Sequence, residues 1–167
     1  MANAQSFPPL ATPDARILIL GSMPGQASLQ AQQYYAHPRN AFWYIMGELF
    51  GAGPELPYEQ RCAVLVAKGV AVWDVLKHCW RPGSLDTSID PSSVEANDFP
   101  RFLADHPDIR HVFFNGRKAE QTFTRHVTPA LEDKPPQCMM LPSTSPAHAA
   151  MSREEKCNAW SVIASVR

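Results

Sequence analysis

Residues 16–25 read RILILGSMPG, and this stretch decides the fold class of the chain. A short apolar run, 16–20, stops at a turn, 21–25, that contains two glycines and a proline. A continuous apolar run, unlike an alternating one, is typical of a parallel strand that is covered on both faces. We therefore expect a buried strand here, with a polar turn at its carboxyl end.

The same pattern recurs along the chain. Three more apolar runs lie at 70–76 (VAVWDVL), 110–114 (RHVFF) and 138–141 (CMML). Helical patterns occupy 41–50, 58–68 and 117–127, and a last helix opens with the capping box of Ser152 and Glu155. Gly51 and Gly69 are expected to end the first two helices. Strands that alternate with helices predict an α/β fold, a three-layer αβα domain over residues 1–167 with a four-stranded, mostly parallel sheet.

The composition, 45% hydrophobic and 19% charged, is that of an ordinary globular protein. A net charge of −1 is mild evidence against a protein that coats nucleic acid. The N-terminus has no signal-peptide pattern, so we expect a cytoplasmic protein without a membrane span. The four cysteines form no CxxC pair, which favours reduced thiols in or near the core over a metal site, and we expect no cofactor.

Polar residues follow each predicted strand. Ser22 follows the first, Asp74 lies near the end of the second, Asn115 follows the third, and the segment 142–146 (PSTSP) follows the fourth. In open parallel sheets, ligands bind outside the carboxyl ends of the strands. The four polar groups are therefore expected to meet at one edge of the sheet and form an active site.

The turn 21–25 lacks both the ending of a phosphate loop and the dinucleotide spacing, so alone it indicates only a strand-to-helix turn. Five blocks in order are more specific: GSMPG (21–25), YYAHPRN (34–40), WDVL (73–76) followed by RPGSLD (81–86), FNGRKA (114–119) and LPSTSPA (141–147). These blocks resemble the hypoxanthine-DNA (deoxyinosine) glycosylase branch of the uracil-DNA glycosylase superfamily. The resemblance runs from about residue 17 to 160 and implies the same three-layer fold.

The resemblance implies a monofunctional enzyme that extrudes a deaminated base, hypoxanthine first among them, and cleaves its glycosidic bond in base excision repair. No lysine is expected as a Schiff-base nucleophile. Its partner would be DNA that contains such a base, with no membrane, no obligate protein partner and a monomeric state. Two alternatives remain: a uracil or mismatch glycosylase of the same fold, and a catalytically weak module that binds lesion DNA.

Twelve residues are candidates for the site. The candidates for catalysis are Asn40, Ser22 and His37. The candidates for contact with the base are Tyr35, Met23, Asp74, Phe42 and Asn115. The candidates for contact with DNA phosphates are Ser143, Thr144, Ser145 and His148.

Each catalytic candidate has a structural alternative. The Asn40 amide could orient the attacking water or contact the base, or it could cap the helix that follows. His37 could act as a general base or order its loop. Ser22 could suggest a hydrolase nucleophile, but GSMPG is not the GxSxG elbow.

The base-contacting candidates are also open to a second interpretation. By the family motif Tyr35 stacks on the extruded base; otherwise it joins an aromatic cluster with Tyr34, Phe42 and Trp43. Asp74 can accept a hydrogen bond from N1–H of hypoxanthine, or it can cap a helix or pair with Arg81.

The remaining candidates include turn residues. Asn115 could line the pocket or make a turn with Gly116, and the segment 143–145 could donate to phosphates or form a rigid surface turn. Met23 and Leu141 stand where other branches carry polar catalytic residues, and His148 stands where this branch is expected to carry Asn. The residue that activates water is therefore left open.

Overall fold

A computed structural model describes residues 2–131 and 135–166 of the chain. Its main sheet contains four parallel strands in the order β3-β2-β6-β7. These strands are β2 (Ile17–Gly21), β3 (Val70–Asp74), β6 (His111–Asn115) and β7 (Gln137–Leu141). β2 lies between two neighbours, and all of its residues are buried. The predicted parallel sheet is confirmed.

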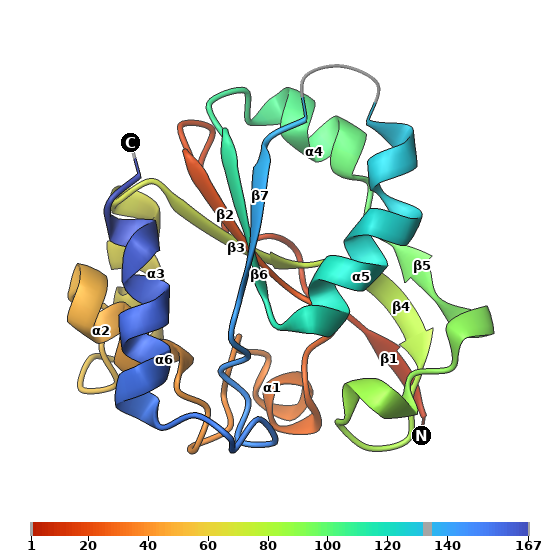
Figure 1. The fold of residues 1–167 in the computed structure, drawn as a ribbon, viewed down its shortest axis with the longest axis horizontal. Coiled ribbons are helices and arrows are strands. Elements are labelled where there is room, and N and C mark those ends of the chain that lie inside the picture. The colour runs from red at the N-terminus through yellow and green to blue at the C-terminus, as the bar shows by residue number, and fades with distance from the viewer. Residues whose placement is uncertain (1, 132–134, 167) are drawn as a thin grey trace.

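Helices cover both faces of this sheet (Figure 1). The first face is covered by α2 (Phe42–Phe50), α3 (Tyr58–Ala67) and α6 (Arg153–Trp160), and the second by α4 (Phe99–Asp105) and α5 (Arg117–His126). Ile17 and Ile19 pack into the first core, whereas Leu18 and Leu20 pack into the second. Because side chains alternate along a strand, one unbroken apolar run supplies two cores. The three-layer arrangement is confirmed.

The predicted helix ends agree with the structure to within a residue or two. Gly51 and Gly69 follow α2 and α3 with φ of 80° and 78°, in the left-handed region that glycine adopts without a Cβ clash. Ser152 accepts from the Glu155 backbone N–H, and the Glu155 side chain accepts in return from the Ser152 N–H. The capping box at the start of α6 is therefore confirmed.

The run 70–76 is not a single strand, which corrects the prediction. β3 ends at Asp74, and β4 (Leu76–Trp80) belongs to a separate antiparallel sheet with β1 (Asn3–Gln5) and β5 (Glu95–Ala96). The backbone N–H of Val75 still donates to the Gly21 carbonyl at 2.8 Å, and beyond it the chain passes into the second sheet. Asp74 is therefore the last residue of β3 in the main sheet.

β7 also departs from the prediction of a strand buried on both faces. It is an edge strand, and only Leu141 is buried, while Met139 and Met140 are 48% and 39% exposed. Cys138 is exposed too, so the expectation of thiols in or near the core is wrong for this residue. An apolar run does not reveal whether the strand lies at the edge of its sheet.

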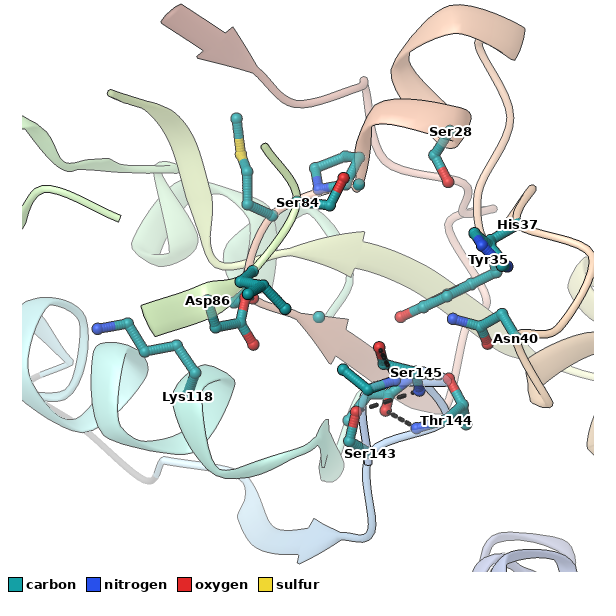
Figure 2. A pocket seen from close by; sticks show the side chains of 18 of the residues that line it. Ser28, Tyr35, His37, Asn40, Ser84, Asp86, Lys118, Ser143, Thr144 and Ser145 are labelled. Atoms are coloured by element: carbon teal, nitrogen blue, oxygen red, sulfur yellow. Dashed lines mark hydrogen bonds between the residues drawn. The ribbon is translucent and has the colours of Figure 1, made fainter. Parts of the chain in front are cut away.

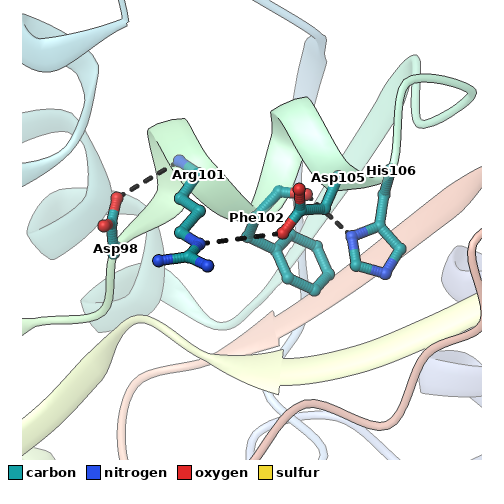
Figure 3. A network of polar contacts seen from close by, with 5 residues as sticks. All are labelled: Asp98, Arg101, Phe102, Asp105 and His106. Atoms are coloured by element: carbon teal, nitrogen blue, oxygen red, sulfur yellow. Dashed lines mark hydrogen bonds and ion pairs between the residues drawn. The ribbon is translucent and has the colours of Figure 1, made fainter.

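No bounds were predicted for two short helices: α1 (Gln26–Ala31), which follows the predicted strand-to-helix turn 21–25, and α4. Figure 3 shows how local polar contacts define the ends of α4. Asp98 accepts from the Arg101 N–H at 3.2 Å, and Nδ1 of His106 lies 2.7 Å from the Phe102 carbonyl oxygen. The Arg101–Asp105 ion pair is exposed, and such pairs contribute little to stability. A helix this short shows no long apolar stripe in the sequence.

Four 3-10 turns complete the described chain: η1 (Asp86–Ser88), η2 (Pro91–Ser93), η3 (Thr128–Ala130) and η4 (Ser161–Ala164). None of the helices in the described part of the chain has the length and apolar character needed to cross a bilayer.

Candidate active site

A cavity of about 640 Å³ opens at the carboxyl ends of the four parallel strands (Figure 2). Its lining includes residues that follow β2, β6 and β7, and Asp74 at the end of β3. All of the predicted site residues line it except Phe42. The predicted convergence of polar groups at one sheet edge is therefore confirmed.

Tyr35 forms an aromatic wall of the cavity and is held there by its neighbours in the chain. The Tyr34 carbonyl accepts from Nε1 of Trp43 at 2.9 Å, and the Ala36 N–H donates to Oγ of Ser28 at 3.0 Å. Between these two anchors Tyr35 adopts φ of 54°, which is unusual for a residue with a Cβ. Strain of this kind persists where the surroundings enforce it, and it turns the Tyr35 side chain to the cavity.

Phe42 does not line the cavity, which corrects its place among the base-contacting residues. It is fully buried, and its ring stacks on that of Tyr35 with centroids 4.0 Å apart and planes 20° apart. Phe42 is the first residue of α2, and its side chain packs into the core between this helix and the sheet. One face of the Tyr35 ring is thus backed by Phe42, which fixes the orientation of the wall.

Asn40 caps α2 and also lines the cavity. Its Oδ1 accepts from the Phe42 N–H at 2.9 Å at the start of α2, as a capping side chain does. This contact assigns the other end of the amide as the nitrogen, and Figure 2 shows that nitrogen directed towards the hydroxyl end of Tyr35. Asn40 therefore offers an N–H donor to the cavity.

His37 lines the cavity in a form poorly suited to act as a base. Its Nδ1 accepts from the Arg39 N–H at 3.1 Å. In the neutral imidazole the proton must then sit on Nε2, which becomes a donor. This geometry favours hydrogen-bond donation by His37 over proton abstraction.

Asp74 lies at the floor of the site and is only 3% exposed. Its Oδ2 is buried without a hydrogen-bond partner, and so is the hydroxyl of Tyr35. A Cβ on Gly21 would lie 2.5 Å from Oδ1 of Asp74 and 3.0 Å from the Tyr35 hydroxyl, so the glycine makes room for both groups. Burial raises the pKa of the Asp74 carboxyl to about 7, helped by the charge of Asp86 and opposed by Arg81.

The loop 81–86 is fastened to the turn that follows β2. Nη2 of Arg81 donates to the Pro24 carbonyl at 2.6 Å, and Oγ of Ser84 accepts from the Gln26 N–H at 2.8 Å. The Ser22 hydroxyl donates to Oδ1 of Asp86 at 2.6 Å. Ser22 is therefore already engaged by a carboxylate and has no basic side chain as its partner, which argues against a role as a nucleophile.

Asn115 and Thr144 hold each other through two hydrogen bonds. Nδ2 of Asn115 donates to Oγ1 of Thr144, and Oδ1 of Asn115 accepts from the Thr144 N–H, both at 2.9 Å. The Thr144 carbonyl also accepts from the Ala41 N–H at 3.0 Å. Thr144 is only 1% exposed and links three segments of the site, and its contact with phosphate stays a prediction.

The flanking serines remain free to donate. Oγ of Ser143 accepts from the Ser145 N–H, and Oγ of Ser145 accepts from the Ala147 N–H, both at 3.2 Å. Because each hydroxyl acts as an acceptor here, its own proton is available to a ligand. Nζ of the buried Lys156 donates to the Ser145 carbonyl at 3.2 Å and helps to fix this loop.

Among the polar residues of the cavity that sequence reasoning missed are Ser84, Asp86 and Lys118. All three lie within the blocks RPGSLD and FNGRKA, so the signal was present but no role was assigned to these positions. In the view of Figure 2 the Lys118 ammonium group lies on the far side of Asp86 from Tyr35 and Asn40.

Taken together, the cavity has an aromatic wall, an amide donor, a buried carboxyl group and a rim of hydroxyls. These groups suit a planar polar heterocycle that remains attached to a phosphodiester chain. The profile of the Uracil DNA glycosylase superfamily matches residues 8–164. The chain therefore belongs to the uracil DNA glycosylase superfamily.

Relatives place it more narrowly. The chain is 33% identical to a hypoxanthine DNA glycosylase of Methanosarcina acetivorans over 160 residues, 95% of this chain and 96% of the relative. It is 38% identical to a hypoxanthine DNA glycosylase of Methanosarcina barkeri over 116 residues, 69% and 72% of the two chains. A solution NMR structure from Methanosarcina acetivorans, provisionally named a uracil DNA glycosylase, matches with a TM-score of 0.80 at 32% identity and covers 97% of this chain and 96% of that one. The resemblance expected from the motifs is confirmed.

Proposed function

We propose that this protein is a monofunctional DNA glycosylase that excises hypoxanthine from DNA in base excision repair. The observation that carries the proposal is the cavity in which the Tyr35 ring, the Asn40 amide and the Asp74 carboxyl meet. The similarity to two relatives named hypoxanthine DNA glycosylase supports the choice of base.

In the proposed reaction the enzyme first extrudes the nucleotide, because C1′ cannot be attacked while the base is stacked in the duplex. The Tyr35 ring replaces the lost stacking on one face of the base, a contribution of roughly 1–3 kcal/mol. Phe42 behind it keeps the ring from rotating away. The hydroxyls of Ser143 and Ser145, with His148, hold the flanking phosphates.

Bond cleavage is then largely dissociative and leaves a sugar with oxocarbenium character. Preorganised dipoles that face the developing charges stabilise this state and need no reorganisation during the reaction. Asn40 presents its N–H donor to the base or the attacking water, while the carboxylate of Asp86 in the same cavity favours the sugar cation. Water adds to C1′ and leaves an abasic site.

The enzyme is expected to lack lyase activity, although Lys118 lines the cavity. A Schiff base requires an amine beside C1′, whereas the Lys118 ammonium points away from the Tyr35 wall in Figure 2. Borohydride in the presence of abasic DNA should therefore trap no covalent complex. A trapped adduct that disappears in Lys118→Gln would make the enzyme bifunctional.

The deciding experiment measures base release from duplexes that contain hypoxanthine, uracil or xanthine, with alkali cleavage of the abasic product. Hypoxanthine should leave faster than uracil, because apolar Met23 occupies the place of a polar group used by uracil-directed relatives. A rate of uracil release that equals or exceeds the rate of hypoxanthine release would favour a uracil glycosylase. Binding of lesion DNA without release of any base would favour a lesion-binding module.

We further infer that the protein acts as a monomer in the cytoplasm and needs no obligate protein partner. The residues proposed to contact the extruded nucleotide line a single cavity, and Phe42 supports the Tyr35 ring from behind. Sedimentation equilibrium with and without DNA should give one protein copy per lesion. Activity that rises with the square of protein concentration would contradict this expectation.

A further inference from the structure

The carboxyl group of Asp74 is buried in the cavity with one oxygen atom that has no partner. It is 3% exposed, lines the cavity, and has an Oδ2 atom without any hydrogen-bond donor. An ionised carboxylate buried in this way would lose its hydration without compensation, whereas the neutral acid loses less. No ion pair among the described residues, 2–131 and 135–166, involves Asp74.

The charged and titratable groups around Asp74 support its neutral form. Burial is the main cause, and the negative charge of Asp86 on η1 adds to it; together they raise the pKa of Asp74 to about 7, against the opposing charge of Arg81 after β4. Tyr35, from the loop after α1, has its hydroxyl near the same carboxyl group, and Tyr34 beside it feels the charge of Asp74. Burial raises the pKa of both phenols, so they carry no charge near neutral pH.

The chemistry of the leaving group explains why a neutral acid is useful here. When the bond between C1′ and N9 breaks, both electrons remain on the purine, and protonation of a ring nitrogen stabilises the departing base. A positioned acid of this kind contributes about 10²–10⁴-fold to a reaction rate, most effectively when its pKa lies near the working pH.

We propose that Asp74 is the general acid that protonates a ring nitrogen of the departing purine, in place of an ionised acceptor for its N1–H. The inference rests on the proposed excision of hypoxanthine. As the C1′–N9 bond breaks, its electron pair passes to the base and the Asp74 O–H gives its proton to N7 or N3. Water then adds to C1′, and the proton that this water releases returns through solvent to the Asp74 carboxylate.

Gly21 makes room for the carboxyl group, and the Tyr35 hydroxyl lies in the same space. The Cβ position of Gly21 is 2.5 Å from Oδ1 of Asp74, so only a glycine at the end of β2 admits the acid to the floor of the cavity. The Tyr35 ring, backed by Phe42, sets the plane in which the base lies. An acid at the end of a strand is held more firmly than one on a loop, as proton transfer to a chosen atom requires.

The direction of the pH profile tests the proposal with the wild-type protein alone. The single-turnover rate on a hypoxanthine duplex should be highest below pH 7 and fall by about tenfold per pH unit above it, because the acid form is lost. A rate that rises through the same range would show that the ionised carboxylate is the active form and would overturn the proposal.

Two variants identify the group responsible. Asp74→Asn keeps a hydrogen-bond donor but cannot transfer a proton, so it should lose about 10²–10⁴-fold in rate and show no fall above pH 7. Asp105→Asn, which removes an exposed carboxylate on α4, should keep the wild-type rate and profile. Asp74→Asn with a wild-type rate and profile would exclude the acid role.

Base analogues identify the atom that receives the proton. Excision of 7-deaza- and 3-deaza-hypoxanthine is compared in wild type and Asp74→Asn. With the analogue that lacks the receiving nitrogen, the difference between the two proteins should vanish; a difference retained with both analogues would overturn the proposal. If the wild type released no hypoxanthine at all, the proposed function itself would fail. That outcome differs from the three that would overturn only the acid role of Asp74, because in each of those the wild type is active.

Discussion

Tyr35 shows how single residues of this site are specialised by their surroundings. Its backbone is held in the left-handed region, one ring face is covered by Phe42, and its hydroxyl is buried without a partner. The ring, not the hydroxyl, should therefore carry the function. Tyr35→Phe should keep the single-turnover rate, whereas Tyr35→Ala should lose the ~1–3 kcal/mol of stacking, about 5- to 150-fold in rate or lesion affinity. Stopped-flow excision assays measure this, and an unchanged rate in Tyr35→Ala would remove the stacking role.

Asn40 separates capping from catalysis at one position. Asp can accept from the Phe42 N–H as Asn40 does, but it has no amide N–H to offer to the cavity. Asn40→Asp should fold with wild-type stability and bind lesion DNA, yet lose ~10²–10³-fold in rate, as expected for a lost transition-state donor. Thermal unfolding, anisotropy and single-turnover assays test the three parts. Full activity in a stable Asn40→Asp variant would leave this residue a structural cap.

Asp74 should lower the stability of the protein, and the sign follows from its raised pKa. The folded value is about 7 and the ordinary value is 3.8, so protons bind the folded state more tightly. The destabilisation is absent below pH 4, grows by ~1.4 kcal/mol per pH unit from pH 4 to 7, and stays constant above pH 7. Relative to wild type, Asp74→Asn should gain about 3 kcal/mol more at pH 8 than at pH 5. Urea unfolding at both pH values measures this gain, with Asp105→Asn as the control. An equal gain from Asp74→Asn at pH 5 and pH 8 would mean that the pKa of Asp74 in the folded protein is not raised.

At the scale of elements, the loop after β7 contains two kinds of residue that look alike in sequence. Thr144 is tied to Asn115 and Ala41, whereas the hydroxyl proton of Ser143 is free. Thr144→Ala should cost about 1–3 kcal/mol of unfolding free energy, because it leaves a buried amide donor unpaired. Ser143→Ala should keep the stability of the protein. It should weaken binding to lesion DNA and to undamaged DNA equally, since phosphate contacts carry no base information. A loss confined to lesion DNA would instead place Ser143 at the base.

The same loop shows how far the site could be predicted. The apolar runs and the polar residues after them were enough to bring Ser22, Asp74, Asn115 and the loop after β7 to one cavity, because parallel strands align their carboxyl ends. Tyr35, His37 and Asn40 lie far beyond the end of β2 in the chain, and only the family resemblance made them candidates. Burial was not predictable for Thr144 and Phe42, since each depends on contacts with segments distant in sequence. Asp86 was missed because its role depends on a hydrogen bond to Ser22 across 64 residues.

The fold was predictable where one strand explained one apolar run, and it was not where the chain changed sheets. The run 70–76 reads as continuous because Val75 and Leu76 are also buried, although they belong to a turn and to β4. From Leu76 onwards the chain pairs with β1 and β5 in place of β2, and no local pattern encodes this change of partner. Likewise the β7 run carries no sign that it lies at an edge.

At the scale of the whole molecule, a net charge of −1 must be reconciled with binding to a polyanion. The cationic residues that line the cavity are Arg117 and Lys118, at the start of α5, and His37 and His148 belong to the same lining. Contacts from serine hydroxyls and backbone N–H groups add no charge and release no counterions. The protein should therefore contact DNA mainly around the cavity, with few ionic contacts to phosphates.

This charge distribution predicts a shallow dependence of DNA affinity on salt. Two phosphate contacts from cations give a slope of about −2 in a plot of log affinity against log salt, because each contact contributes about −0.9. Lys118→Gln should make the slope shallower by about one, and it should weaken binding to lesion DNA and to undamaged DNA alike. Lys68→Gln, just before β3 and near the opposite ends of the strands, is the matched control and should leave the slope unchanged. Fluorescence anisotropy across a salt series measures both; a slope steeper than about −5, or one that Lys118→Gln leaves intact, would mean that DNA lies across a wider surface than the rim of the cavity.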